Sequence, residues 1–377
     1  MTADPPFVKK EPPAPLRVLL VLVLLYGFLV GVGLLETGIA SLGAGFQTAF
    51  IASVTNPISG LFAGILMTVL VQSSSVSTAT IVGLVGSGAL PVNLAIPMIM
   101  GANIGTTVTN TLASLGSIRR SEEFQRGFAA ATVHDFFNLL AVLIILPLEL
   151  LTGFLAKSAT WLTGILRDAD FETTAPGSSP IRQAVKLPID ALRGVFEPGV
   201  VTGVIFIVLG LALIFLALTF ITKNMRRLVA GGVQKAMNRF IGGGGGVFGI
   251  LVGIGVTIAV QSSSITTSIL VPLVAAGVLT LRSAYPITVG ANIGTTVTAL
   301  LASLAVLLPA GLTIALVHTL FNITAMLIIF PLKQVRNVPI VLAERMAAVA
   351  TKNHSLVAAY VLGLFVVIPL LGIFLIP

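Results

Sequence analysis

Long apolar runs constrain this chain more than any other feature of its sequence. A helix needs about 20 consecutive apolar residues to cross a bilayer, and seven runs approach or exceed that length. They are Leu16–Leu35, Ala95–Leu115, Phe128–Leu150, Val201–Ile221, Ala284–Leu308, Leu312–Leu332 and Leu356–Ile376. The runs are continuously apolar, whereas barrel strands would alternate over about 10 residues. Only 9% of the residues are charged, against about 25% in soluble domains. The sequence therefore predicts an all-α polytopic membrane protein whose first run is a span.

The chain contains an internal repeat. Val71–Leu115 aligns with Val260–Leu304 without a gap and with 26 identities in 45 positions. VQSSS begins both segments, and GANIGTTVT occurs verbatim in both. Further along, Gly127–Leu148 aligns with Gly311–Leu332 with 12 identities in 22, including an H-x-x-F-N pattern. The order QSSS, GANIGTT, H-x-x-F-N in each half indicates gene duplication.

The apolar arms around each QSSS are too short to be full spans. Runs of 10 to 14 apolar residues are more often re-entrant, so we predict that each QSSS is the tip of a re-entrant helical hairpin. We also predict that each GANIGTT breaks a transmembrane helix. A hairpin makes no net crossing, and three spans separate the two hairpins. An odd number of crossings inverts the second copy relative to the first, so the prediction is two inverted-topology repeats.

Charge supports one orientation of this topology. With the N-terminus inside, sixteen Lys and Arg residues fall in inner segments and five in outer ones, as the positive-inside rule expects. The net charge of +8 is thereby explained without nucleic acid. The expected organisation is an N-terminal tail, first transmembrane helix and interfacial segment (1–58), repeat 1 (59–150), an outer loop (151–199), a linking transmembrane helix and basic inner loop (200–246), repeat 2 (247–332), and an amphipathic inner segment with the last transmembrane helix (333–377).

The repeated polar clusters point to a binding site. Scattered Ser and Thr residues in membrane helices usually serve close packing. Paired interruptions at equivalent points of two inverted halves instead mark a transporter's substrate site near the midplane. Helix N-termini attract anions, yet neither cluster contains Lys or Arg. This chemistry predicts neutral donors for an anion, with bound cations supplying the countercharge.

His134 and Asp135 form the ionisable pair within a span. An acidic residue there is a functional hypothesis by default, and the second copy has Thr319 in place of Asp135 while keeping His318. An additional, asymmetric cation site is one interpretation. The alternative is that Asp135 lies near the inner end and pairs with Arg126 or His134. We expect the histidines to be structural hydrogen-bond partners rather than proton carriers.

QSSS and GANIGTT in both halves, together with AATVHDFFN at Ala130–Asn138, resemble the type II sodium-dependent phosphate cotransporters. The likeness extends from about Gly60 to Pro331. It implies Na⁺-driven import of inorganic phosphate by alternating access across the cytoplasmic membrane, with a cytoplasmic N-terminus. Asp135 matches the aspartate associated with an additional Na⁺ and electrogenic transport. The short, cysteine-free outer loop is what a bacterial member would have.

The resemblance and the polar clusters together give two sets of candidate residues. The phosphate set is Gln72, Ser73, Ser74, Ser75, Asn103, Thr106, Gln261, Ser262, Ser263, Ser264 and Asn292. The sodium set is Asp135, Asn138, Ser262, Thr295, Thr298 and Asn322. Na⁺ is the coupling ion and no cofactor is expected. Partners are phosphate, Na⁺ and the lipid bilayer; the sequence does not fix the oligomeric state, and a dimer is compatible with it.

Other functions remain to be weighed. A symporter of the same build could carry another oxyanion, such as sulfate or arsenate. An anion channel is a second alternative, but paired hairpins around a closed polar site suit alternating access better than a continuous pore. A hydrolase using Ser74, His134 and Asp135 is disfavoured, because the serine cluster is duplicated and the aspartate is not, and no G-x-S-x-G context is present. We therefore expect a transporter rather than an enzyme.

Overall fold

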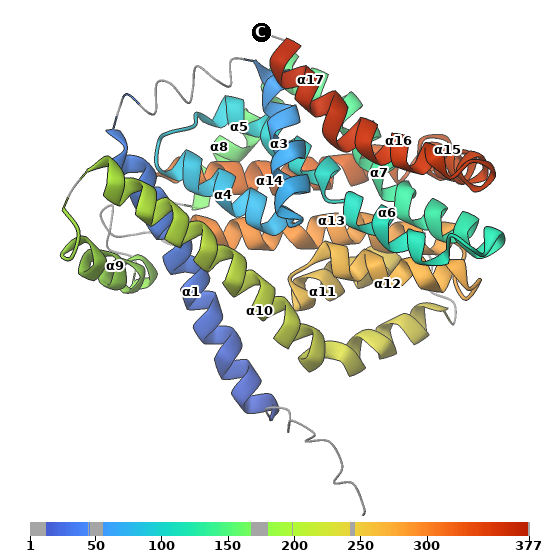
Figure 1. Ribbon diagram of the computed structural model, residues 1–377, viewed down its shortest axis with the longest axis horizontal. Coiled ribbons are helices and arrows are strands. Elements are labelled where there is room, and N and C mark those ends of the chain that lie inside the picture. The colour runs from blue at the N-terminus through green and yellow to red at the C-terminus, as the bar shows by residue number, and fades with distance from the viewer. Residues whose placement is uncertain are drawn as a thin grey trace, which may run out of the picture.

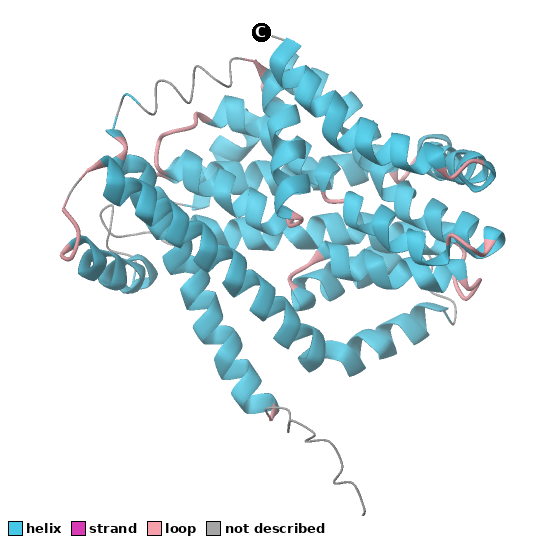
Figure 2. Ribbon diagram, in the orientation of Figure 1, coloured by secondary structure: helices cyan, strands magenta, loops and turns pink. Residues whose placement is uncertain are grey.

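The computed structural model describes residues 13–43, 45, 56–166, 180–197, 199–241 and 246–375. These form helices joined by loops and turns (Figure 2), and within these ranges there is no strand. Six helices or helix pairs are long and apolar enough to cross a membrane. They are α1 (Ala14–Ser41), α5 with α6 (Val92–Gly105 and Val108–Ser114, followed by the turn η1, Leu115–Ser117), α7 (Ser121–Thr152), α10 (Val200–Ile241), α14 (Pro309–Ile329), and α16 with α17 (Ser355–Leu362 and Ile368–Leu375, joined by the π-helical turn η3, Gly363–Val367). The helical membrane fold is thus as predicted.

The seventh predicted span differs from the others. It corresponds to α13 (Leu281–Ser303), which is 23 residues long but is not among the six helices that qualify. Its middle contains the polar GANIGTT sequence, which lowers its mean hydropathy. Much of α13 is buried by other helices of the protein, which is where a polar membrane helix is tolerated.

Each QSSS joins two short helices. The first pair is α3 (Pro57–Val71) and α4 (Ser74–Gly86), and the second is α11 (Val247–Val260) and α12 (Ser263–Ala275). At 13 to 15 residues and 1.5 Å per residue, each helix is about 20 Å long. That is shorter than the roughly 30 Å hydrocarbon core of a bilayer, as the hairpin prediction requires.

The glycines of GANIGTT serve close helix packing. A Cβ on Gly101 of α5 would lie 2.0 Å from the Leu61 carbonyl oxygen of α3, and one on Gly290 of α13 would lie 2.0 Å from that of Ile250 in α11. The facing glycines are as close: a Cβ on Gly64 of α3 would lie 2.1 Å from the Met98 carbonyl oxygen, and one on Gly253 of α11 would lie 2.1 Å from that of Ile287. In each repeat the first helix therefore crosses the third in the same way, α3 on α5 and α11 on α13, with the backbones in direct contact.

This packing corrects the prediction that GANIGTT breaks a helix in both halves. In the first copy α5 ends at Gly105 and α6 begins at Val108, so there is an interruption. Thr106 and Thr107 keep right-handed helical angles, however, so the chain turns without unwinding. In the second copy α13 continues through the motif and the prediction is wrong. The glycines are needed for the crossing, and the hydroxyl of Thr295 bonds back to the Ala291 carbonyl at 3.0 Å.

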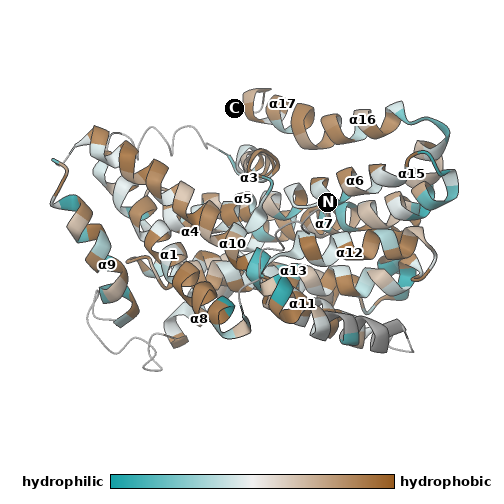
Figure 3. Ribbon diagram, turned by 60° about the horizontal axis from the view of Figure 1, so that its bottom comes forward, coloured by the Kyte–Doolittle hydropathy of each residue, from teal (hydrophilic) through white to brown (hydrophobic). Residues whose placement is uncertain are grey.

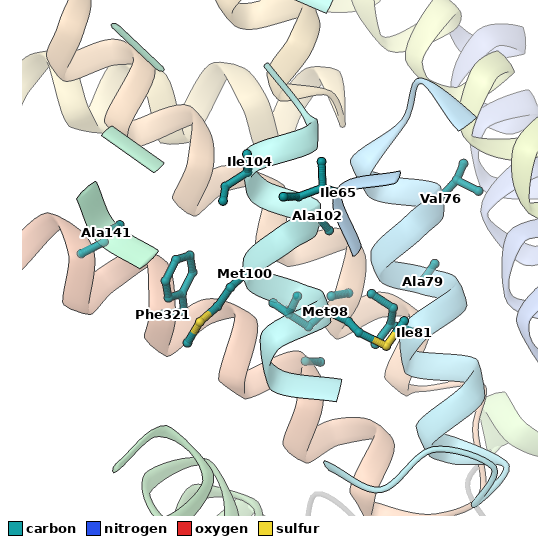
Figure 4. Close-up of a cluster of buried hydrophobic side chains, with 14 of the residues drawn as sticks. Ile65, Val76, Ala79, Ile81, Met98, Met100, Ala102, Ile104, Ala141 and Phe321 are labelled. Carbon is teal, nitrogen blue, oxygen red and sulfur yellow. The ribbon is translucent and has the colours of Figure 1, made fainter. Parts of the chain in front are cut away.

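The halves also exchange contacts. α4 packs on α13 and α14, and α12 packs on α6 and α7, so the second helix of each pair lies against the other half. Figure 4 shows part of the resulting core, where Met100 of α5 lies beside Phe321 of α14 and Met98 of α5 lies beside Ile81 of α4. α1 packs along α10, and both helices contribute buried side chains to the core. Hydrophobic residues cover most of the helices in Figure 3.

The segments outside the repeats are more helical than predicted. The predicted outer loop contains α8 (Phe154–Leu166) and α9 (Pro180–Arg193). The predicted basic inner loop is instead a continuation of α10 to Ile241, because no proline interrupts the segment after Ile221. The amphipathic segment is α15 (Lys333–Lys352), which packs on α7. The N-terminal tail and most of the predicted interfacial segment lie outside the described residues.

The described helices define two ends of the molecule. Figures 1 and 3 both show α9 at one end, and α15 with the α6–α7 turn at the other. α4 extends from the middle toward the α9 end, and α12 extends toward the α15 end. The two QSSS tips therefore lie near the middle of the molecule, with their second helices pointing in opposite directions.

Candidate functional site

The two QSSS tips have nearly identical backbones. Gln72 and Gln261 adopt the left-handed conformation, with φ of 56° and 58°, and end the first helix of each pair. Ser73 and Ser262 follow as N-caps, and their hydroxyls accept hydrogen bonds from the backbone N–H groups of Val76 and Ile265. A serine cap and a left-handed residue are ordinary signals for starting and ending helices. The chain therefore breaks at the same Gln–Ser step in both halves, as predicted.

A threonine from GANIGTTVT holds each tip glutamine. Thr109 donates its hydroxyl hydrogen to Oε1 of Gln72 at 3.3 Å, and Thr298 does the same to Gln261 at 3.2 Å. Each glutamine amide also donates to a carbonyl in the last turn of its own first helix. Both side chains are thus oriented by equivalent contacts. Thr298 was predicted as a sodium ligand, and its observed contact in this structure is with the tip.

Both tips open onto one cavity of about 770 Å³. Five residues of the predicted phosphate set line it: Gln72, Ser73, Ser75, Gln261 and Ser262. These side chains are neutral and offer amide and hydroxyl donors. The arrangement also aims two helix N-termini, those of α4 and α12, at the same region, where the partial positive charge of each favours an anion.

The opposite wall of this cavity is basic. α10 contributes Lys223, Arg226 and Arg227, with Thr219 and Thr222 from the turns before them. Lys223 and Arg226 are exposed, so their charges remain hydrated at the rim. Sequence reasoning missed these residues as part of the site, because it assigned them to a loop and used them only to orient the chain. Had the helix been extended through them, their spacing of three and four residues would have shown a shared face.

The remaining predicted phosphate residues do not line the cavity. Ser74 and Ser263 are buried in the first turns of α4 and α12, and Ser264 follows Ser263 in α12. Thr106 bonds back to the Ala102 carbonyl at 2.8 Å, and the Asn103 amide bonds back to that of Ile99 at 3.0 Å. The Thr106 and Asn103 side chains are thus satisfied by backbone carbonyls of α5.

A buried polar network joins the halves behind the tips. Asn292 donates its amide hydrogen to Oδ1 of Asn138 at 2.7 Å, and Asn138 donates to the Asn103 carbonyl at 2.9 Å. His134 Nε2 bonds Oδ1 of Asn292. The histidine is a hydrogen-bond partner here, as expected. Asn322, the second-copy counterpart of Asn138, does not form an equivalent network with the described residues. Its amide bonds the His318 carbonyl of its own helix, and its Oδ1 has no hydrogen-bond partner among them.

Asp135 is fully buried on α7 and faces the C-terminal helix. The Tyr360 hydroxyl of α16 donates to Oδ2, while none of the described residues donates a hydrogen bond to Oδ1. The side chains of Thr107 and Thr111 lie near the carboxyl group, and their hydroxyls donate to backbone carbonyls of Ile104 and Thr107. Pairing with Arg126 or His134 is wrong, since Arg126 bonds the Ala275 carbonyl and Glu122 instead. Asp135 thus sits among hydroxyl groups, beside the first-copy helix interruption.

Two further residues were missed. Asn110 of α6 accepts hydrogen bonds from Thr267 and Ser268 of α12, at 3.0 and 3.2 Å, and so joins the first half to the second tip's helix. Thr109 orients Gln72, as described above. The verbatim repeat of GANIGTTVT was the signal for Thr109, since Thr298 is its counterpart. No sequence signal marks Asn110, because the second copy has Ala299 there.

The fold and site define a duplicated polytopic membrane protein with a polar, solute-sized cavity between its halves. The Na⁺/Pi-cotransporter family model matches residues 28–160 and 213–344. The chain belongs to this family, as the sequence resemblance indicated.

Curated relatives agree with this assignment. The sodium-dependent phosphate transport protein 2B of Homo sapiens is 32% identical over 444 residues, covering 94% of this chain and 64% of the relative. The 2A proteins of Ovis aries and Rattus norvegicus are each 34% identical, covering 94% of this chain and 67% of the relative. The chain therefore spans about two thirds of the length of these relatives. No solved structure matches it.

Proposed function

We propose that this protein is a Na⁺-coupled symporter that imports inorganic phosphate across the cytoplasmic membrane by alternating access. The observation that carries the proposal is the meeting of both QSSS tips on one cavity. A duplicated pair of helix interruptions around a single cavity is how inverted-repeat transporters build a substrate site. The names of the relatives, which specify sodium and phosphate, supply the ion and the substrate.

Phosphate would bind between the tips. Gln72, Ser73, Ser75, Gln261 and Ser262 would donate hydrogen bonds to its oxygens, and the N-termini of α4 and α12 would add their partial charges. The basic residues of α10 would draw the anion toward the cavity from the rim, because exposed charges act over roughly a Debye length of 8–10 Å.

Sodium would supply countercharge near these neutral donors. Asp135, with an unpaired carboxylate oxygen and neighbouring threonine hydroxyls, is the strongest of the predicted ligands. Thr295, Thr298, Asn138 and Asn322 belong to the same set, as does Ser262. Oxygen ligands from carboxylate, hydroxyl and amide groups suit a hard cation. An additional Na⁺ bound at Asp135 would add one positive charge to those carried with each phosphate, which would make transport electrogenic.

The membrane arrangement follows from the same features. α3–α4 and α11–α12 would be re-entrant hairpins entering from opposite sides, because each helix is too short to span and α4 and α12 point to opposite ends (Figure 1). The α15 end would be cytoplasmic, with the N-terminus on that side. Lys333, Arg336, Arg345 and Lys352 of α15 support this orientation.

Phosphate uptake into proteoliposomes tests the proposal. Purified protein would be reconstituted with K⁺ inside, and labelled phosphate would be added with either Na⁺ or K⁺ outside. We expect uptake only with the inward Na⁺ gradient, and excess sulfate should not compete with it. Uptake that is the same in Na⁺ and K⁺ would contradict the coupling. Competition by sulfate would show that the site accepts oxyanions other than phosphate.

A variant pair connects uptake to the cavity. Ser262→Ala removes a hydroxyl that lines the cavity and caps α12, so uptake should fall by about tenfold or more, given 1–3 kcal/mol for a lost charge-assisted bond. Ser283→Ala, in the first turn of α13 and away from the cavity, is the matched control and should transport normally. Equal uptake by the two variants would remove Ser262 from the site.

A further inference from the structure

A second, smaller cavity lies at the α15 end, away from the QSSS tips. Its volume is about 190 Å³, and it lies where α13 begins and α14 gives way to α15. Its lining includes Arg282, Tyr285, Phe330, Lys333, Arg336 and Asn337. Three of these six side chains are cationic.

Within the described ranges, the three cations have no carboxylate partner. Among the described residues, none of the ion pairs involves Arg282, Lys333 or Arg336. Arg282 donates a hydrogen bond to the Asn337 side chain at 2.9 Å. Arg336 lies over the Phe330 ring, 5.0 Å from its centroid. Both guanidinium groups are therefore positioned by neutral neighbours, which leaves their charges uncompensated at the cavity.

Tyr285 adds a buried donor without an acceptor. Its side chain is 0% exposed, and its hydroxyl has no hydrogen-bond partner in the part of the chain that the structure describes. The ring is held between Phe137 and Phe330, with centroid distances of 6.0 and 6.3 Å. A buried polar group is normally satisfied, and leaving one unpaired costs about 1–3 kcal/mol. An acceptor in the adjacent cavity would remove that cost.

The N-terminus of α15 faces the same place. The helix begins at Lys333 after an N-cap leucine that makes no side-chain hydrogen bond, so its first N–H groups keep their capacity to donate. Cations, a hydroxyl donor and a helix N-terminus are all complementary to an anion with several acceptor oxygens, which describes a phosphate group.

The first copy lacks these residues. At the equivalent positions it has Asn93 for Arg282 and Ile96 for Tyr285, and continuing the alignment places Glu149 opposite Lys333 and Thr152 opposite Arg336. Glu149 there binds the backbone N–H groups of Leu155 and Ala156. The cavity's chemistry is therefore not inherited from the duplication, so repeat architecture does not explain it.

We propose that this cavity is a second anion site, which binds a phosphate group through Arg282, Lys333, Arg336 and the Tyr285 hydroxyl. Such a group could belong to free inorganic phosphate or to the headgroup of an anionic phospholipid, since both present the same oxygens. The site carries its own positive charge, so its occupancy should not require Na⁺. The inference is independent of the proposed transport function.

Binding in Na⁺-free medium tests the proposal. The full-length protein in detergent, with choline replacing Na⁺, would be given labelled inorganic phosphate in equilibrium dialysis. In parallel, added phosphatidic acid would be followed by native mass spectrometry. Retention of phosphate identifies the free anion as ligand, retention of the lipid identifies the headgroup, and retention of both supports the shared chemistry.

Variants decide whether the binding belongs to this cavity. Arg282→Gln with Arg336→Gln should weaken binding at least tenfold, because two charge-assisted contacts are lost. Tyr285→Phe keeps the buried ring and removes only the hydroxyl, so it should weaken binding about threefold to tenfold in a protein that still folds. Arg345→Gln, exposed on the same helix, is the matched control and should bind normally.

Three outcomes would overturn the proposal. The first is that neither probe binds in choline medium. The second is that the arginine and tyrosine variants bind as well as the parent chain. The third is that Gln261→Ala abolishes the binding. The last result would place the anion in the cavity between the QSSS tips instead.

Discussion

The two halves of this protein share their frame and differ in their chemistry. In both, the first and third helices of the repeat cross at glycines where an added Cβ would lie about 2 Å from a carbonyl oxygen, and a threonine fixes the tip glutamine. They differ where α5 and α6 are interrupted while α13 is continuous, and where Asp135 stands opposite Thr319. The repeated residues build the support and the two tips, and unrepeated residues such as Asp135 make the halves chemically different.

The glycine crossings should show the largest effect. Gly101→Ala and Gly290→Ala each place a methyl group 2.0 Å from a backbone carbonyl oxygen, and backbone cannot move aside as a side chain can. Each variant should lose about 3 kcal/mol of folding free energy, the upper part of the range for overpacking. Size-exclusion chromatography and thermal unfolding in detergent would measure the loss.

The comparison predicts that these two glycine variants are equally damaging. Gly116→Ala has no atom within 4 Å of the new methyl group and is the control. If one half tolerated its substitution, the two crossings would not be equivalent supports.

Asp135 tests the asymmetry between the halves. Asp135→Gly removes the buried carboxylate, so the net charge moved per phosphate should fall by about one, because an intramembrane carboxylate is the expected cation ligand. Current and labelled uptake would be recorded from the same proteoliposomes. Thr319→Ala, at the equivalent position, should leave this ratio unchanged. An unaltered ratio in Asp135→Gly would exclude the residue from the sodium sites.

The basic face of α10 gives a smaller expected effect. Arg226→Gln should weaken the apparent phosphate affinity about threefold to tenfold at low salt, because the lost attraction is electrostatic and exposed. The difference should shrink as ionic strength rises. Lys235→Gln changes a charge on the same helix outside the cavity and should behave as the parent. A salt-independent loss would indicate that Arg226 contacts phosphate directly.

The threonine clamps should show the smallest effect. Thr109→Val and Thr298→Val each remove one hydrogen bond to a tip glutamine while preserving side-chain shape. A neutral bond contributes about 1 kcal/mol, so phosphate affinity should fall about fivefold. Kinetics of uptake would compare the two. A loss confined to Thr298→Val would favour the sodium-ligand role predicted for that residue.

Much of this fold was readable from the sequence because its signals are local. Apolar run length predicted the spans, and the short apolar arms around each QSSS predicted the breaks between short helices. GANIGTT misled, because a glycine that allows unwinding also allows close packing, and only the position of the neighbouring helix distinguishes these. The α10 basic face and the Asp135–Tyr360 contact depend on which helices meet, and the sequence pattern contains no information on that pairing.

The glycine crossings have a mechanical consequence. α3 is locked to α5 by mutual backbone contact and by the Thr109 clasp beyond it, and α11 is locked to α13 in the same way. Each such pair should travel as one rigid body, so the sliding surfaces of the transport cycle lie elsewhere, including where α4 meets α1 and α10. The chain has no cysteine, so engineered disulfides can test which helix pairs move relative to each other. A bridge within a pair should leave uptake intact, whereas one across a sliding surface should stop it.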